Sequence, residues 1–276
     1  MFGLDMGMRG AAIATVIANV SSFVVLCWYF TSGRSTIALA RRHLRPHLQE
    51  LPEIVKIGSA SFFSMVVGSL MAIPINSLIV HYGDDIHLAI LGVANRCMMF
   101  FFLPIFGLTQ GLQPIIGFNF GAGNARRVKD AVRVASMYAT LLSIAAFLVL
   151  MIGTRPVLRV FTPDAELIAE GTPILRIIII FMPFVGFQMV GGSFFQAIGR
   201  ARPAFVLTLS RQVLVLLPLI YALPRFYGLD GLWSAFPIAD FASTSITAWW
   251  VFTTVRNMRI EPKSDAGDAG TIPVDL

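Results

Sequence analysis

The stretch LAILGVANRCMMFFFLPIFGLTQGLQ, from Leu88 to Gln113, decides the fold class of this chain. It contains a single charged side chain, Arg96, which follows the amide Asn95. A helix needs about 20 consecutive, mostly apolar residues to cross a bilayer, and this stretch exceeds that length. It therefore predicts a transmembrane helix that carries two polar residues at a position where polar groups are costly.

Six further stretches of the chain have the same length and character. The backbone of a membrane span must satisfy its hydrogen bonds internally, so each stretch is expected to be helical. The sequence thus predicts an all-α, polytopic membrane protein with seven transmembrane helices. The other six predicted spans are residues 10–30, 54–80, 128–153, 167–189, 203–223 and 231–255.

Composition and charge agree with a membrane protein. Of the 276 residues, 56% are hydrophobic and 13% are charged, and the mean hydropathy is +0.76. Soluble domains carry roughly 45–50% apolar and about 25% charged residues, so a cytosolic enzyme and a disordered chain are excluded. Most of the 21 Lys and Arg residues fall in the loops after the first, third and fifth spans and in the C-terminal tail. By the positive-inside rule these segments are cytoplasmic in a bacterial inner membrane, so the net charge of +6 reports orientation rather than a nucleic-acid partner.

Two segments of the chain are similar to each other. Gly7–Asn19 opens the first predicted span and Gly228–Asp240 opens the last, and both are expected to enter the membrane from outside. Parallel repeats of this kind are typical of secondary transporters. The repeat predicts a fragment in which five spans of an earlier lobe lie upstream. The alternative is a complete seven-span protein with a chance similarity.

The repeat also predicts the domain organisation. Residues 1–32 are expected to be the last helix of an N-terminal lobe, and residues 54–256 a complete six-helix C-terminal lobe. Residues 33–53 are expected to form a cytoplasmic basic linker, either a surface helix or a loop. The polar residues 257–276 are expected to form a disordered cytoplasmic tail.

The run QGLQPIIGFNFGAGNARRVK, Gln110–Lys129, resembles the repeat signature of the multidrug and toxic compound extrusion (MATE) family. A second block, Phe195–Ala204 with Arg211-Gln212 and Pro237–Asp240, resembles the bacterial multidrug-export branch of that family. The resemblance implies one lobe of a V-shaped protein with two six-helix lobes, plus the last helix of the other lobe.

The same resemblance implies an activity. MATE proteins export cationic or amphipathic compounds in exchange for H⁺ or Na⁺ by alternating access, without a cofactor other than the coupling ion. The expected partners are the lipid bilayer, small-molecule drugs and the missing N-terminal lobe or a partner half, and the chain alone is expected to be inactive. The alternative is a flippase for a lipid-linked saccharide from the same superfamily.

One departure from the family pattern concerns coupling. Many MATE proteins carry an acidic residue in the seventh helix and another in the tenth. Here residues 54–80 contain no acid, and the span that corresponds to the tenth helix offers Gln188 instead. The main coupling carboxylate is therefore expected in the N-terminal lobe.

Polar residues within predicted spans are the candidates for function. Arg211 and Asp240 lie at similar depths in consecutive antiparallel spans and predict a buried pair, which either fixes helix register or takes part in transport. Arg96 is expected to line the cavity, to bind an interior carbonyl or to extend to the outer interface. The uncharged amides are expected to hydrogen-bond between helices or to line the cavity. No nucleophile–base or metal-ligand pattern supports the third hypothesis, an intramembrane enzyme. The candidate residues of the substrate or ion pathway are Asn76, Asn95, Arg96, Gln188, Arg211 and Asp240.

Overall fold

The structure of this protein is a computed structural model that describes residues 7–32 and 51–258. These segments form helices joined by short turns and contain no β-strand, which confirms the all-α class. The chain divides into two compact units, Met1–Glu53 and Ile54–Leu276. Helix α1 (Gly7–Thr31) belongs to the first unit and contains the first predicted span. The predicted linker and C-terminal tail lie largely outside the described residues.

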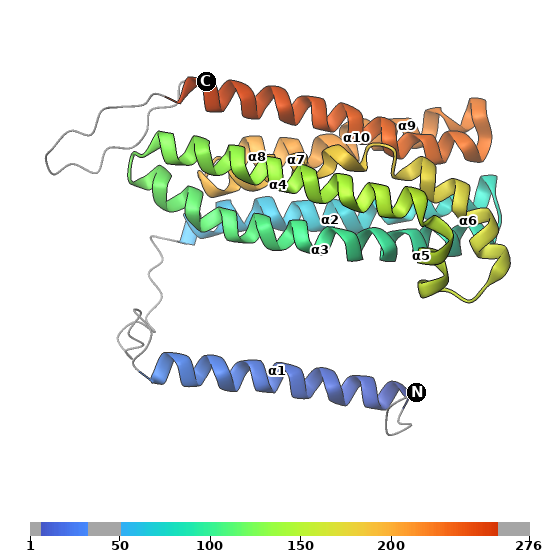
Figure 1. Cartoon of the computed structure of the whole chain (residues 1–276), viewed down its shortest axis with the longest axis horizontal. Coiled ribbons are helices and arrows are strands. Elements are labelled where there is room, and N and C mark those ends of the chain that lie inside the picture. Colours follow the sequence, from blue (N-terminus) through green and yellow to red (C-terminus); the bar gives the residue numbers. More distant parts are fainter. Residues whose placement is uncertain (1–6, 33–50, 259–276) are drawn as a thin grey trace, which may run out of the picture. The chain divides into compact units, whose positions relative to one another are not determined.

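The second unit is a bundle of long helices that run side by side, drawn from cyan to red in Figure 1. Helix α4 packs against α3 and α7, and α10 packs against α7 and a π-helical segment, η2. Its elements in chain order are α2 (Leu51–Tyr82), α3 (Asp85–Gly121), α4 (Ala125–Ile152), α5 (Thr154–Phe161), α6 (Ala165–Ile178), α7 (Met182–Ala197), α8 (Ala201–Leu209), η2 (Ser210–Leu216), α9 (Leu217–Ala222) and α10 (Pro224–Asn257).

The stretch that decides the fold class lies inside α3, which has 37 residues. At 1.5 Å per residue, α3 is about 55 Å long, well beyond the ~30 Å hydrocarbon core of a bilayer. By length and hydropathy, four of the described helices, α1 to α4, can cross a membrane. A fifth span is present if α6 and α7 together make one. The count of seven spans therefore stays a prediction.

The predicted span 167–189 is not one helix. Helix α6 ends at Ile178, α7 begins at Met182, and the two helices are bent by 54° relative to each other. Pro183 lies in the first turn of α7, where its missing N–H costs no intrahelical hydrogen bond. Within a continuous helix, Pro183 would remove one hydrogen bond and clash with the carbonyl of Ile179, and the break lies at this position.

The last two predicted spans are also irregular. Residues 203–223 change from α-helix to π-helix over Ser210–Leu216 and then return to α-helix. Residues 231–255 lie in α10, whose backbone leaves helical geometry at Gly228, where φ is 56°. Helices α1 to α4 meet the length and hydropathy criteria for a membrane span, and these two regions do not.

Buried side chains form two clusters along the bundle. One cluster joins α2, α3, α6, η2 and α10 around Trp233, and the other joins α3, α4, α7 and α8 around Phe194 and Phe195. The helices approach closely at small residues, since a Cβ on Gly186 of α7 would overlap the backbone carbonyl oxygen of Ala139 in α4. Close approach at small residues is how membrane helices pack, because lipid provides no hydrophobic driving force between them.

A tight turn joins α3 to α4. Gly123 adopts a φ of 70°, a conformation that glycine reaches without steric strain. Asn124 Oδ1 accepts a hydrogen bond from the backbone N–H of Arg127 at 3.2 Å and caps α4. The signature run Gln110–Lys129 therefore contains the turn that allows α3 and α4 to pack against each other.

Candidate functional site

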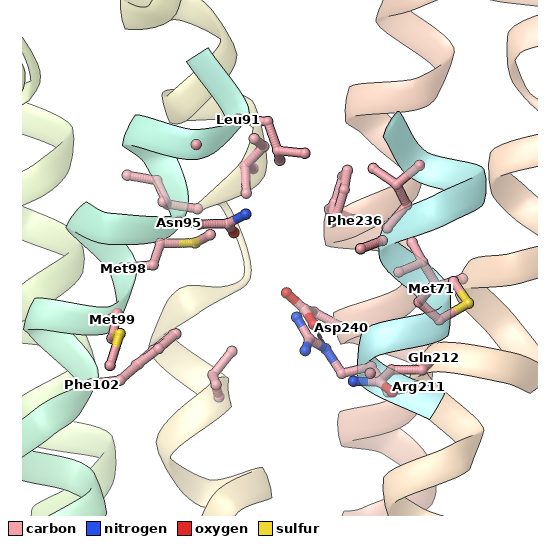
Figure 2. A pocket seen from close by; sticks show the side chains of 18 of the residues that line it. Met71, Leu91, Asn95, Met98, Met99, Phe102, Arg211, Gln212, Phe236 and Asp240 are labelled. Atoms are coloured by element: carbon pink, nitrogen blue, oxygen red, sulfur yellow. Dashed lines mark hydrogen bonds and ion pairs between the residues drawn. The ribbon is translucent and has the colours of Figure 1, made fainter. Parts of the chain in front are cut away.

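The second unit contains a partly open cavity of about 630 Å³. Its walls come from α2, α3, the break between α6 and α7, η2 and α10. Figure 2 shows methionine and aromatic side chains on these walls, among them Met71, Met98, Phe102 and Phe236. The volume lies in the range of small-molecule sites, which are mostly apolar with a few placed polar groups.

Two irregular backbone segments form part of this cavity. The break between α6 and α7 contributes Ile178, Ile179 and Met182 to the wall. Interrupted helices are tolerated at membrane depth where they are buried in protein or line a cavity, and in transporters they often form binding sites. The second segment is η2, whose wide turn is closed by the backbone N–H of Leu217 donating to the carbonyl of Gln212. A π-helical turn within an α-helix frequently marks a functional site.

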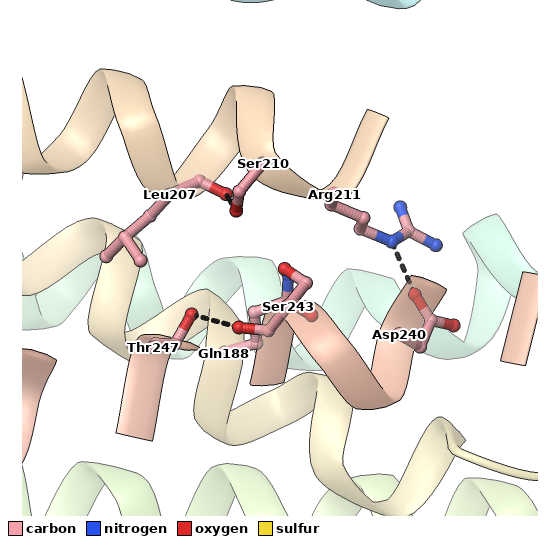
Figure 3. Close-up of polar contacts among 7 residues, drawn as sticks. All are labelled: Gln188, Leu207, Ser210, Arg211, Asp240, Ser243 and Thr247. Atoms are coloured by element: carbon pink, nitrogen blue, oxygen red, sulfur yellow. Dashed lines mark hydrogen bonds and ion pairs between the residues drawn. The ribbon is translucent and has the colours of Figure 1, made fainter. Parts of the chain in front are cut away.

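A charged pair lies on the cavity wall. Arg211 Nε of η2 donates to Asp240 Oδ1 of α10 (Figure 3). The Asp240 side chain is 8% exposed and that of Arg211 is 39% exposed. This contact confirms the predicted pairing of the two residues, and their role in transport stays a prediction. Breaking such a pair by removing one partner is costly, because it leaves a buried charge without a counterion.

Uncharged amides complete the polar part of the cavity. Asn76 of α2 and Asn95 of α3 line it, and Figure 2 shows Asn95 across the open space from Asp240. Gln212 also lines it, and its Oε1 is buried without a hydrogen-bond partner among the described residues. Gln212 is absent from the predicted site residues. Its signal in the sequence is its place beside Arg211 in an apolar segment.

Two predicted site residues do not line the cavity. Gln188 Nε2 of α7 donates instead to Ser243 Oγ of α10 (Figure 3), which fits the predicted interhelical hydrogen bond. Arg96 is exposed on α3 outside the cavity lining. The reason is geometric, because each residue turns a helix by about 100°. When Asn95 faces the cavity, its neighbour Arg96 points elsewhere.

The chemistry of the cavity suits binding rather than catalysis. Flexible methionine and broad aromatic surfaces can adapt to apolar molecules of different shape. In the described segments there is no group of three or more His, Cys, Asp and Glu side chains that could hold a metal ion. The arrangement can hold an amphipathic molecule by a few polar contacts and many apolar ones.

Comparison with known sequences gives a consistent result. The MatE family model matches residues 60–222. The multidrug export protein MepA of Staphylococcus haemolyticus (strain JCSC1435) is 25% identical over 264 residues, which cover 96% of this chain and 58% of MepA. MepA of Staphylococcus aureus (strain MSSA476) is 26% identical over 235 residues, covering 85% of this chain and 51% of MepA. The chain therefore spans little more than half the length of these relatives.

Solved structures share the fold. The MATE multidrug transporter DinF-BH, solved in complex with rhodamine 6G, is 39% identical with a TM-score of 0.79 over 91% of this chain and 56% of that one. A MATE structure in complex with MaL6 has 22% identity and a TM-score of 0.84, over 92% of this chain and 58% of that one. The second likeness shows the fold alone.

Proposed function

This chain belongs to the MatE family, and we propose that its second unit is one lobe of a secondary active multidrug antiporter whose transport pathway includes the cavity. Members of the family are transporters rather than enzymes. The observation that carries the proposal is the cavity itself. It lies among apolar helices and combines adaptable apolar walls with the charged pair Arg211–Asp240.

Alternating access is the proposed mechanism. The lobe rocks against a second lobe, so that the cavity faces each side of the membrane in turn. The 54° bend between α6 and α7 lies at the cavity wall and supports a movement in which the two half-helices change their angle. We place the protein in a bacterial inner membrane with a cytoplasmic C-terminus, on the distribution of basic residues between the loops.

The proposed driving force is an inward gradient of H⁺ or Na⁺. A membrane potential supplies about 2.3 kcal/mol per elementary charge and 100 mV. Asp240 is the one acid among the residues that line the cavity, and Arg211 already neutralises it. A carboxylate paired with a guanidinium attracts a coupling cation weakly, which supports a main coupling carboxylate in the second lobe.

The lipid-linked saccharide flippase is the weaker alternative. Such a protein needs several cations to hold a pyrophosphate, and Arg211 is the one cationic residue among those that line the cavity. Arg96 lies outside the lining, so it adds no support to this alternative.

Export by a two-lobed protein tests the proposal. The part of DinF-BH that precedes the matched region is fused to this chain and expressed in an efflux-deficient bacterium. We expect lower cellular accumulation of rhodamine 6G or of its carboxylate form, rhodamine 19, than in cells that express this chain alone. Export by the 276-residue chain alone would contradict the need for a second lobe.

A variant of the same fusion tests the charged pair. If Asp240 is released and protonated during the cycle, Asp240→Asn abolishes export while the protein still reaches the membrane. Undiminished export by this variant would leave the pair with a structural role only.

A further inference from the structure

The two side chains of the charged pair differ in how far they are exposed. The Arg211 side chain is 39% exposed, whereas that of Asp240 is 8% exposed. Only Nε of the guanidinium donates to Asp240, and both Nη groups of Arg211 make no hydrogen bond to any residue in the described segments. A molecule in the cavity therefore finds more accessible surface on Arg211, with its free N–H donors, than on the carboxylate.

Among the described residues that line the cavity, no other charge opposes this polarity. Arg211 and Asp240 are the two ionisable residues among those that line it. The carboxylate keeps the guanidinium in place through Nε, and most of the surface that the pair leaves exposed belongs to the arginine. A formally neutral pair thus offers a positive face to a ligand.

A guanidinium with free Nη groups selects for a particular chemistry. Its planar N–H donors match the two oxygens of a carboxylate, and such charge-assisted hydrogen bonds are stronger than those between neutral groups.

The rest of the cavity fits the remainder of such a ligand. Met71, Met98, Phe102 and Phe236 offer apolar and aromatic surface, and Asn95 lies across the open space from the charged pair (Figure 2). A molecule of moderate size can thus place an acidic group on Arg211 while its apolar body contacts methionine and phenylalanine side chains.

We propose that this cavity selects amphipathic molecules that carry a carboxylate or similar anionic group, which Arg211 binds through its Nη groups. The inference rests on the proposed function, because it names the substrate chemistry of the same cavity. Compounds with a cation as their only polar group are expected to bind weakly here, since the one acid in the lining is paired and nearly buried.

Binding of matched fluorescent probes to the full-length chain tests the inference. Dansylglycine carries a carboxylate, dansylglycinamide is its neutral analogue, and the dansyl amide of ethylenediamine carries an ammonium group. We expect the purified protein in detergent to bind dansylglycine about tenfold more tightly than the neutral probe, as a hydrogen bond to a charged group implies. The ammonium probe is expected to bind most weakly.

Three variants identify the group responsible. The double variant Arg211→Gln, Asp240→Asn removes both charges together, so it leaves no unpaired charge, and the preference is expected to fall below about twofold. Asp240→Asn alone leaves the guanidinium without its counterion, and the preference for the carboxylate is expected to persist or increase. Arg225→Gln removes an exposed arginine outside the cavity lining and is expected to bind all three probes like the unmodified chain.

Three results would overturn the inference: tightest binding of the ammonium probe, an unchanged preference in the double variant, or no binding of any probe. The export test addresses the proposed function, and the binding test addresses this inference, so one can fail without the other. Selective binding without export by the two-lobed fusion leaves the inference standing and removes the proposed function. Export of rhodamine 6G together with preferred binding of the ammonium probe would support the proposed function and overturn the inference.

Discussion

At the scale of single residues, the hydrogen bond between Gln188 and Ser243 connects α7 with α10 inside the apolar bundle. Gln188 Nε2 donates to Ser243 Oγ, and the Ser243 side chain is fully buried. Gln188 Oε1 has no hydrogen-bond partner within the described part of the chain, so this amide already has one unsatisfied atom. Its remaining contact is therefore important for the packing of α7 against α10.

We expect Ser243→Ala to destabilise the protein by about 1 kcal/mol, because it leaves the whole Gln188 amide without a partner. The measurement is the thermal unfolding temperature in detergent. Ser245→Ala is the matched control, since the Ser245 hydroxyl is exposed and donates only to the Phe241 carbonyl of its own helix. Equal melting temperatures for both variants would show that the Gln188–Ser243 contact adds no stability.

The sequence predicts which charged residues pair better than it predicts which polar residues line the cavity. A charge in an apolar stretch is costly and needs a partner, so matched depths in neighbouring spans were enough to pair Arg211 with Asp240. An amide has several acceptable partners, and its place depends on helix rotation. Helix rotation is what separates Gln188, which bonds to α10, from Gln212, which lines the cavity.

At the scale of helices, α4 and α7 approach each other closely at Gly186. A Cβ on Gly186 would overlap backbone atoms of Ala139, whereas a Cβ on Gly192 of the same helix meets no atom within 4 Å. Both glycines lie inside a helix, so replacing either by alanine gains up to about 1 kcal/mol of helix propensity. The two positions therefore differ in packing alone.

We expect Gly186→Ala to lower the unfolding temperature, because overpacking costs about 1–3 kcal/mol and exceeds the gain in helix propensity. Gly192→Ala is expected to leave the unfolding temperature unchanged or to raise it. Thermal unfolding of both proteins in the same detergent measures the difference. A Gly186→Ala protein as stable as the Gly192→Ala protein would mean that α4 and α7 are packed less closely than in this structure.

The interruptions of the helices are the part of the fold that hydropathy did not predict. Apolar residues continue through the break between α6 and α7 and through η2, so the predicted stretches 167–189 and 203–223 look uniform. Pro183 is a local signal of the first break. The π-helix has no comparable signal, because tertiary packing decides where a helix accepts a wider turn.

At the scale of the whole molecule, orientation in the membrane follows from the basic loops. Figure 1 places the α3–α4 turn and the α5–α6 connection at opposite ends of the bundle. Arg126, Arg127 and Lys129 follow the first of these, which the positive-inside rule assigns to the cytoplasm. The second is therefore predicted to lie outside.

Labelling of single cysteines tests this orientation. In a protein with Cys27→Ser and Cys97→Ala, we expect Ala165→Cys to react with a membrane-impermeant maleimide on intact cells. Ala122→Cys is expected to react only after the cells are permeabilised. Both alanines are exposed, so access to the reagent depends on the side of the membrane. The opposite labelling pattern would show that the chain has the inverse of the predicted orientation.

The π-helical turn has a consequence for the comparison of related sequences. A hydrogen bond from residue i to i+5 encloses one more residue than the α-helical bond to i+4. A relative with one residue fewer between Ser210 and Leu216 would rotate everything after the gap by about 100°. Either its counterpart of Arg211 would turn away from Asp240, or its counterparts of Leu216 and Ile220 would leave the core. Ligand preference can therefore be transferred between relatives only where this helix has the same number of residues.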